Sequence, residues 1–420
     1  MLVAQTFLLK CFGFMPLYTD KFRHQNVRAR LASLTTSLIA VSLLLGTLYS
    51  SCQQCASFIN GFLKSTVSDQ HDEPDTVLKV MQLMPFPIIN SRGLAVLFLF
   101  FIKRRQWPTV MQDFHAFCSR TLCPPFVTNK TLKKCTIIGI LLCIVTVLLH
   151  GTWETTEWVA YLKTARNTTV QSSKFVTAAV VSTLFSSLPF LLSQQVFLCL
   201  LILSMVLGEA LTALARVIQT EIVTYDIVNH RLTPATGKEI AGTLLKVKLW
   251  EFHHMQMLLF FQSISQFFSL ILFVAHGMDF LVVLGFVANI VLNNRSDLMS
   301  YVYLVGSSII FLSYGTLFLG PLITVHERSC KLGLSLHCLS FSVEQYLTTP
   351  FENNVNLYAP GVRLIKRLKQ FELVCEKRTL LFHGMDLIYY NRRFVAWTST
   401  FLLSFMVVAR QFFASERGAK

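Results

Sequence analysis

The chain has 420 residues, of which 53% are hydrophobic and only 14% charged, and its net charge is +15. A mean hydropathy of +0.54 excludes a soluble globular protein and indicates a membrane protein. The excess of basic residues would also suit a nucleic-acid-binding protein, but the membrane topology accounts for it without such a partner.

Seven stretches are long and apolar enough to cross a hydrocarbon core of about 30 Å, which takes ~20 residues in a helix. In chain order they are 31–52, 80–102, 136–153, 175–206, 257–276, 301–324 and 394–413. An eighth apolar stretch, 280–292, is too short to span alone, and we expect it to prolong the fifth helix. The sequence therefore predicts an all-α membrane protein with seven transmembrane helices.

The distribution of Lys and Arg predicts the orientation, because cytoplasmic loops accumulate these residues. With a cytosolic N-terminus (1–30), the inner segments carry 27 Lys and Arg, whereas the outer segments carry 8. The C-terminal tail, 414–420, is then extracellular. We expect no nucleic acid as a partner.

Two Asn-x-Ser/Thr sequons lie in predicted outer loops, at Asn167 and Asn294, and are predicted glycosylation sites. The eleven cysteines show no metal-binding spacing. Cys52 and Cys55 form one Cys-x-x-Cys pair at an outer helix end, for which a disulfide or free thiols are favoured over zinc. We expect no metal, no cofactor and no enzyme, because no nucleophile–base pair or phosphate loop is recognisable.

Two inner segments have helical periodicity of their own. Apolar residues recur every three or four positions from Leu207 to Tyr225, which predicts that the fourth helix continues below the membrane. Thr236 and Glu239 form a possible capping box for a helix that runs on into the fifth span. The sequence thus predicts a cytosolic helical hairpin at 207–256.

The last inner segment, 325–393, is predicted to form a cytosolic anchor region. Pro360 marks a plausible helix start. An apolar stripe then follows, formed by Val362, Ile365, Leu368, Phe371 and Cys375. Such stripes must be buried, and their simplest partners are each other and neighbouring copies of the chain.

The last span ends in a specific pattern, Ser404-Phe405-Met406-Val407-Val408-Ala409-Arg410-Gln411-Phe412. It resembles the signature that closes the seventh helix of insect gustatory receptors: Thr-Tyr, five hydrophobic residues, Gln-Phe. The preceding segment, 388–394, also resembles the family pattern, with Asn391 thirteen residues before Ser404. The chain departs from the pattern at Ser404, at Phe405 and, more strongly, at Arg410.

This resemblance implies a ligand-gated, non-selective cation channel in the plasma membrane of chemosensory neurons. It implies a homotetramer or a heteromer with related receptors, a pore lined by the seventh helix (394–413) and a tastant pocket in the outer half of 31–324. Gln411 and Phe412 would shape the gate, supported by Ser404 and Phe405. The alternative is that Gln411 and Phe412 merely end a helix at the interface.

Arg410 complicates a cation pore, because four arginines facing the axis would repel cations. It lies roughly 25 Å up the last helix from Arg393, near the outer interface, where a long side chain can reach water. We therefore expect Arg410 to face away from the pore; otherwise conduction or gating would be unusual.

The tastant pocket can be sought where polar groups lie at membrane depth, since such groups usually face a bundle interior. Candidate residues are Arg92, Trp153, Glu154, Glu157, Trp158, Ser186, Gln194 and Gln195. The alternative is an ion pair of Arg92 with Glu154 or Glu157 and ordinary interhelical contacts of the other residues.

Ligand chemistry is less constrained than architecture. No residues match the sugar or carbon-dioxide branches of the family, so a bitter or other contact chemical is expected. An odorant receptor of the same architecture is the nearest alternative function. A transporter is a weaker one, because the seven unequal spans show no internal repeat.

Overall fold

The computed structural model describes residues 9–15, 27–68, 85–120, 172–231, 237–292, 298–348 and 355–418, with isolated positions between 133 and 148. Its long elements are helical. In chain order the elements are α3 (Val27–Ser68), α5 (Pro85–Lys103), α6 (Trp107–Arg120), α8 (Ser172–Arg231), α9 (Gly237–Leu292), α10 (Leu298–Thr348), α11 (Val355–Lys377), β1 (His383–Gly384), β2 (Ile388–Tyr389) and α12 (Arg392–Gly418).

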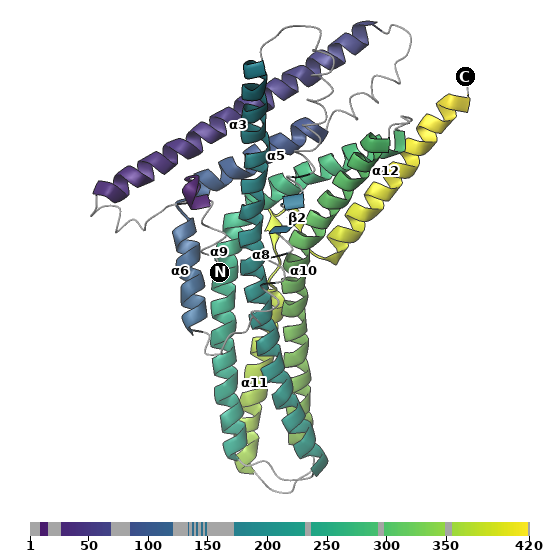
Figure 1. The fold of residues 1–420 in the computed structure, drawn as a ribbon. Coiled ribbons are helices and arrows are strands. Elements are labelled where there is room, and N and C mark those ends of the chain that lie inside the picture. The colour runs from purple at the N-terminus through teal and green to yellow at the C-terminus, as the bar shows by residue number, and fades with distance from the viewer. Residues whose placement is uncertain are drawn as a thin grey trace.

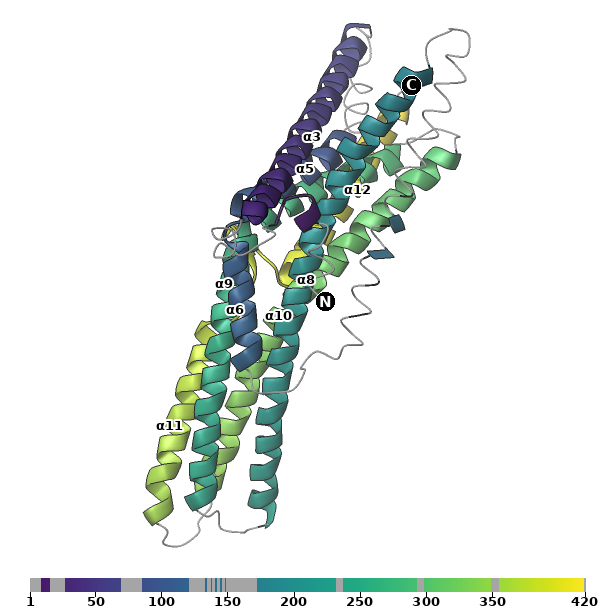
Figure 2. The ribbon, with the colours of Figure 1, turned by 60° about the vertical axis from the view of Figure 1, so that its left-hand side comes forward.

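The helices form two tiers (Figure 1). At one end a four-helix stalk combines α11 with one half each of α8, α9 and α10; we define it as residues 207–231, 237–256, 325–348 and 355–377. At the other end the remaining halves of these helices spread apart and are joined by α3, α5 and α12. Figure 2 shows the same division from another side, with α6 alongside α9.

The lengths of α8 and α9 explain why the molecule has a stalk. They contain 60 and 56 residues. At 1.5 Å per residue they are about 90 and 84 Å long, whereas a hydrocarbon core is only about 30 Å thick. Each helix must therefore project far beyond a bilayer. Both run without a break, in agreement with the periodicity that predicted continuous helices, and 280–292 does prolong α9.

Among the described residues, three helices are long and apolar enough to cross a membrane, at Leu31–Ala56, Leu188–Asp226 and Ile240–Ile290. The predicted sixth and seventh spans lie in α10 and α12, and most of the second lies in α5. Most of the predicted third span, 136–153, lies outside the described residues. Seven spans and the orientation of the termini therefore stay predictions.

The core of the stalk corrects two details of the sequence analysis. Pro360 does not start α11, which begins at Val355. Val362 is exposed, whereas Leu364, Leu368, Phe371 and Cys375 are buried. The reason is Gly361, where an added Cβ would lie 2.6 Å from the Leu347 side chain. This close contact turns the glycine face of α11 inward, and a stripe of hydrophobic residues does not reveal a glycine.

A short hairpin precedes α12 and was not predicted. Strands β1 and β2 pair antiparallel through a three-residue loop, Met385 to Leu387, in which Met385 and Asp386 have φ of 52° and 57°. Gly384 lets the hairpin lie directly on α9, because a Cβ there would be 3.2 Å from Phe273. The hairpin thus fixes the direction in which the chain enters α12.

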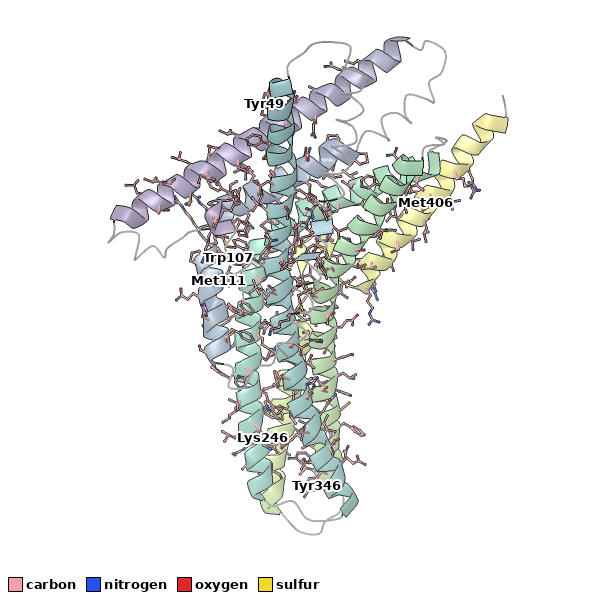
Figure 3. All side chains as sticks on the ribbon, in the orientation of Figure 1. Tyr49, Trp107, Met111, Lys246, Tyr346 and Met406 are labelled. Atoms are coloured by element: carbon pink, nitrogen blue, oxygen red, sulfur yellow. The ribbon has the colours of Figure 1, made fainter. Side chains whose placement is uncertain are left out.

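Figure 3 places representative side chains on this frame. Lys246 and Tyr346 lie in the stalk, Trp107 and Met111 on α6, and Met406 on α12. Trp107 packs on Phe267 of α9, with ring centroids 5.5 Å apart. This contact ties α6 to the junction between the two tiers.

Candidate functional site

The most unusual buried group is Arg92, in the middle of α5. It is 2% exposed and forms an ion pair with Asp279 of α9, in which Nη2 donates to Oδ2 at 2.9 Å. Its Nη1 donates to Ser193 Oγ of α8 at 3.2 Å. Because a charged group in an apolar interior is costly unless it is paired, this one side chain fixes three helices against each other.

Two aromatic rings complete the environment of the guanidinium. Its Cζ lies 5.6 Å from the ring centre of Phe190 and 5.2 Å from that of Phe197, both on α8. Rings at this distance attract a cation through their quadrupole, by about 1 kcal/mol or more when water is excluded. The positive charge is therefore compensated from within the chain.

Asp279 was not expected as the partner of Arg92, for which an ion pair with Glu154 or Glu157 was the alternative to a ligand pocket. Those two glutamates lie outside the described residues, as do Trp153 and Trp158. A signal for Asp279 was present, because it is the one acidic, Lys or Arg residue in the apolar run 257–292. A lone carboxylate in such a run needs a cation, and Arg92 is the cation placed at the same depth.

Gln194 is a second buried polar group beside this cluster. It is 1% exposed, and neither its amide nitrogen nor its amide oxygen has a hydrogen-bond partner among the described residues. It lies four residues after Phe190 and three before Phe197, so it shares a helix face with both rings. A buried amide without partners costs about 1–3 kcal/mol, which a ligand with matching groups could recover.

The other predicted pocket residues on α8 are Ser186 and Gln195. Gln195 is buried, 7% exposed, on the same helix. Ser186 belongs to α8, but its side chain is not among those described. Close helix contact occurs nearby, since a Cβ added at Gly93 of α5 would lie 3.1 Å from the backbone nitrogen of Phe190. The structure thus places Arg92 against the stretch of α8 that carries Gln194 and Gln195.

The base of α12 is held at two points. Tyr390 is fully buried, and its hydroxyl lies 3.1 Å from His276 Nδ1 of α9. Arg392, which is largely exposed, donates from Nη2 to Glu327 Oε2 of α10 at 3.0 Å. Between them, Asn391 Oδ1 accepts a hydrogen bond from the backbone nitrogen three residues on, at 3.0 Å, and so caps the helix.

The predicted gate residues lie on α12, and the described part of the chain contacts only a small part of the surface of this helix. Ser404, Arg410 and Gln411 are exposed and Phe405 is half-buried, while the side chain of Phe412 is not described. Among the described elements α12 packs mainly against α9, where Phe401 meets Phe280 at 5.4 Å. Its exposed large side chains include Trp397, Leu403, Val407 and Val408.

An exposed apolar stripe also runs along α9 from the stalk towards the upper tier. It consists of Leu245, Leu249, Phe252 and Leu259. Their spacings of four, three and seven residues place them on one helix face. Such a face in an aqueous region is normally covered by another protein surface.

The predicted glycosylation sites, Asn167 and Asn294, lie outside the described residues.

The whole fold is similar to that of an insect olfactory receptor. The structure of OR5 from Machilis hrabei in complex with eugenol matches with a TM-score of 0.65 at 12% identity, over 98% of this chain and 97% of that one. A second structure of this receptor matches with a TM-score of 0.62 at 11% identity, over 98% and 99% of the two chains. No protein-family model and no curated protein matches the sequence.

The likeness extends over both tiers, so the chain has the fold of an insect olfactory receptor, the architecture given above as the nearest alternative to a gustatory receptor. Together with the apolar helices this fold indicates a multi-pass membrane protein. The matched receptor is olfactory, and the assignment to the gustatory branch stays a prediction.

Proposed function

We propose that the chain is a subunit of a ligand-gated, non-selective cation channel that depolarises a chemosensory neuron. The observation that carries this proposal is the likeness to an insect olfactory receptor over 98% of the chain. The closing pattern 404–412 supports contact chemosensation, with a bitter or other non-sugar tastant. The olfactory nature of the matched receptor supports the second candidate, an odorant receptor.

The junction around Arg92 is the proposed ligand site, and its chemistry suggests the ligand class. Asp279 already neutralises Arg92, so a neutral ligand suits the site better than a charged one. Gln194 offers an amide donor and acceptor that no described residue pairs with, and Phe190 lies on the same helix face. Eugenol, which the matched receptor binds, is a small aromatic molecule with hydroxyl and ether oxygens. A tastant of this kind fits the groups present.

The remaining pocket candidates complete this site in the proposal. Gln195 and Ser186 would extend it along α8, and the third predicted span would close it. From that span the side chains of Trp153, Glu154, Glu157 and Trp158 would contribute aromatic faces and carboxylates.

The pore is proposed to form where α12 helices of several copies meet. The poor cover of α12 by its own chain supports this role, because a lone helix with exposed apolar residues needs neighbours or lipid. Gln411 and Phe412 would form the outer gate, with Ser404 and Phe405 beneath them. Arg410 would face away from the axis. The stripe on α9 supports assembly through the stalk, as a homotetramer or with related receptors.

Whole-cell current in cells expressing the chain, with a panel of aromatic tastants, tests the proposal. We expect an inward cation current that saturates with ligand. We also expect Gln194→Leu to raise the half-activating concentration about tenfold, as the loss of one good hydrogen bond predicts. Gln262→Leu, at an exposed position of α9, is the matched control and should leave the curve unchanged.

Two outcomes decide between functions. Saturable uptake of a substrate without ligand-evoked current would exclude a channel and favour a transporter. A response to volatile ligands alone, with no response to contact chemicals, would favour the odorant receptor. Co-expression of related receptors covers the case in which a second type of subunit is required.

A further inference from the structure

A series of polar side chains leads from the Arg92 junction to the base of α12, with buried residues, Arg92 and Tyr390, at its two ends. Arg92 pairs with Asp279 on α9. His276 lies three residues earlier on α9, hence on the same face, one turn away. Its Nδ1 is 3.1 Å from the hydroxyl of Tyr390, and the two rings lie 4.9 Å apart. Tyr390 directly precedes the capping residue of α12.

We propose that Tyr390 is a positioning residue, which latches the base of α12 to α9 and so couples the ligand site to the pore helix. This inference rests on the proposed function, and it concerns how that function is regulated. The latch is the hydrogen bond between Tyr390 and His276. The Nδ1 of His276 also lies 2.9 Å from Leu272 O, which can only accept, so Nδ1 carries the proton and donates to both oxygens. Asp279, on the same turn of α9, links it to the state of Arg92.

The described arrangement is the resting one, because the guanidinium of Arg92 binds groups of its own chain. Its Nη2 donates to Asp279 and its Nη1 to Ser193. A neutral ligand group that accepts a hydrogen bond from Arg92 competes with Asp279 for the guanidinium and lengthens the ion pair without removing the countercharge. A movement of the Asp279 carboxylate shifts the turn of α9 that carries His276. A hydrogen bond of 3.1 Å is lost after a shift of about 0.5 Å, so a small movement suffices to open the latch.

The surroundings of Tyr390 make it a firm attachment point. The side chain is fully buried, and its backbone nitrogen donates to Phe382 O at 3.0 Å. Gly384 lies so close that an added Cβ would be 3.2 Å from the Tyr390 hydroxyl. The second attachment of the α12 base, Arg392 to Glu327, is solvent-exposed and has no described link to Arg92. Only the buried attachment can sense the ligand site.

The first test compares Tyr390→Phe with Tyr389→Phe in current recordings. Tyr389→Phe is the matched control, because it removes the same hydroxyl from the neighbouring residue, which is 46% exposed. We expect Tyr390→Phe to raise the ligand-free current and to lower the half-activating concentration about fivefold, with no change in Tyr389→Phe. A merely structural role would reduce surface expression and maximal current without moving the half-activating concentration. That result, or a shift to higher concentration, would overturn the latch.

The second test needs no ligand and uses the purified full chain. We expect amide hydrogen exchange in residues 392–400 to accelerate in Tyr390→Phe and in Asp279→Asn, but not in Tyr389→Phe. Unchanged exchange in Tyr390→Phe would overturn the latch even if no tastant is known. In another outcome, the wild-type chain gives no current with any ligand of the panel while exchange still accelerates in Tyr390→Phe as expected. That combination would count against the proposed channel function alone.

Discussion

At the scale of single residues, the Arg92–Asp279 pair shows how a polar group can be both a cost and a constraint. The pair lies between helices α5 and α9, with the arginine almost fully buried. Removing one partner of a buried pair leaves an uncompensated charge, which typically costs 3–5 kcal/mol. Replacing both partners by apolar residues of similar size is often neutral.

We therefore predict opposite results for single and double replacement. Asp279→Asn should destabilise the folded chain by about 3 kcal/mol, because it leaves the guanidinium without a countercharge. The double change Arg92→Met with Asp279→Leu should return to within about 1 kcal/mol of the wild type. Thermal unfolding of the detergent-solubilised protein measures both. The control is Asp386→Asn, at an exposed turn position. Equal unfolding temperatures for Asp279→Asn and the wild type would mean that the pair contributes nothing.

The same pair marks the limit of sequence reasoning about the site. Arg92 could be recognised, because a charge inside an apolar run is conspicuous. Its partner was harder to choose among Glu154, Glu157 and Asp279. The lone position of Asp279 in an apolar run favours it, but the choice also depends on how helices rotate about their axes. Gln194 could be named as a polar residue at depth, but its lack of a partner within the described part of the chain is a property of packing alone.

At the scale of elements, the hairpin before α12 is the part least visible in the sequence. Hairpin turns in which both central residues adopt positive φ favour Asn-Gly or Asp-Gly. Here Met385 and Asp386 occupy these positions, so the usual signal is missing. The long helices were predictable by contrast, since the apolar periodicity of α8 and α9 continues through their whole length. Pro360 and Val362 were misread because Gly361 sets the buried face of α11.

The turn provides a prediction of increased stability. Met385 has φ of 52°, which costs a residue with a bulky side chain about 1 kcal/mol and is easily adopted by Asn. Met385→Asn should therefore stabilise the hairpin by about 0.5–1 kcal/mol. The backbone hydrogen bond from Met385 N to Ser269 Oγ, 2.9 Å long, is retained. The measurement is the unfolding temperature, with Leu387→Asn as a control at an exposed position of ordinary φ. A lower unfolding temperature for Met385→Asn would refute the argument from strain.

At the scale of the whole molecule, composition and periodicity predicted a membrane protein of long helices, but not how the helices share their surfaces. Within the described chain, α8, α9, α10 and α11 bury one another in the stalk. The stripe of Leu245, Leu249, Phe252 and Leu259 stays uncovered. The stalk has a well-packed core, and yet this surface is apolar and exposed. The simplest explanation is that another copy of the chain covers it.

Assembly through this stripe gives the last prediction. Leu249→Glu combined with Phe252→Glu introduces two carboxylates into the proposed contact between copies, where they would have to be buried without partners. We expect the variant to fold but to sediment as a monomer in detergent, and to give no ligand-evoked current, because the pore needs several α12 helices. Lys248→Glu is the matched control: it adds a carboxylate at an exposed position next to the stripe and should leave the assembly intact. If the double variant keeps the mass of the wild-type assembly, copies associate through another surface, and the exposed face of α12 becomes the first one to test.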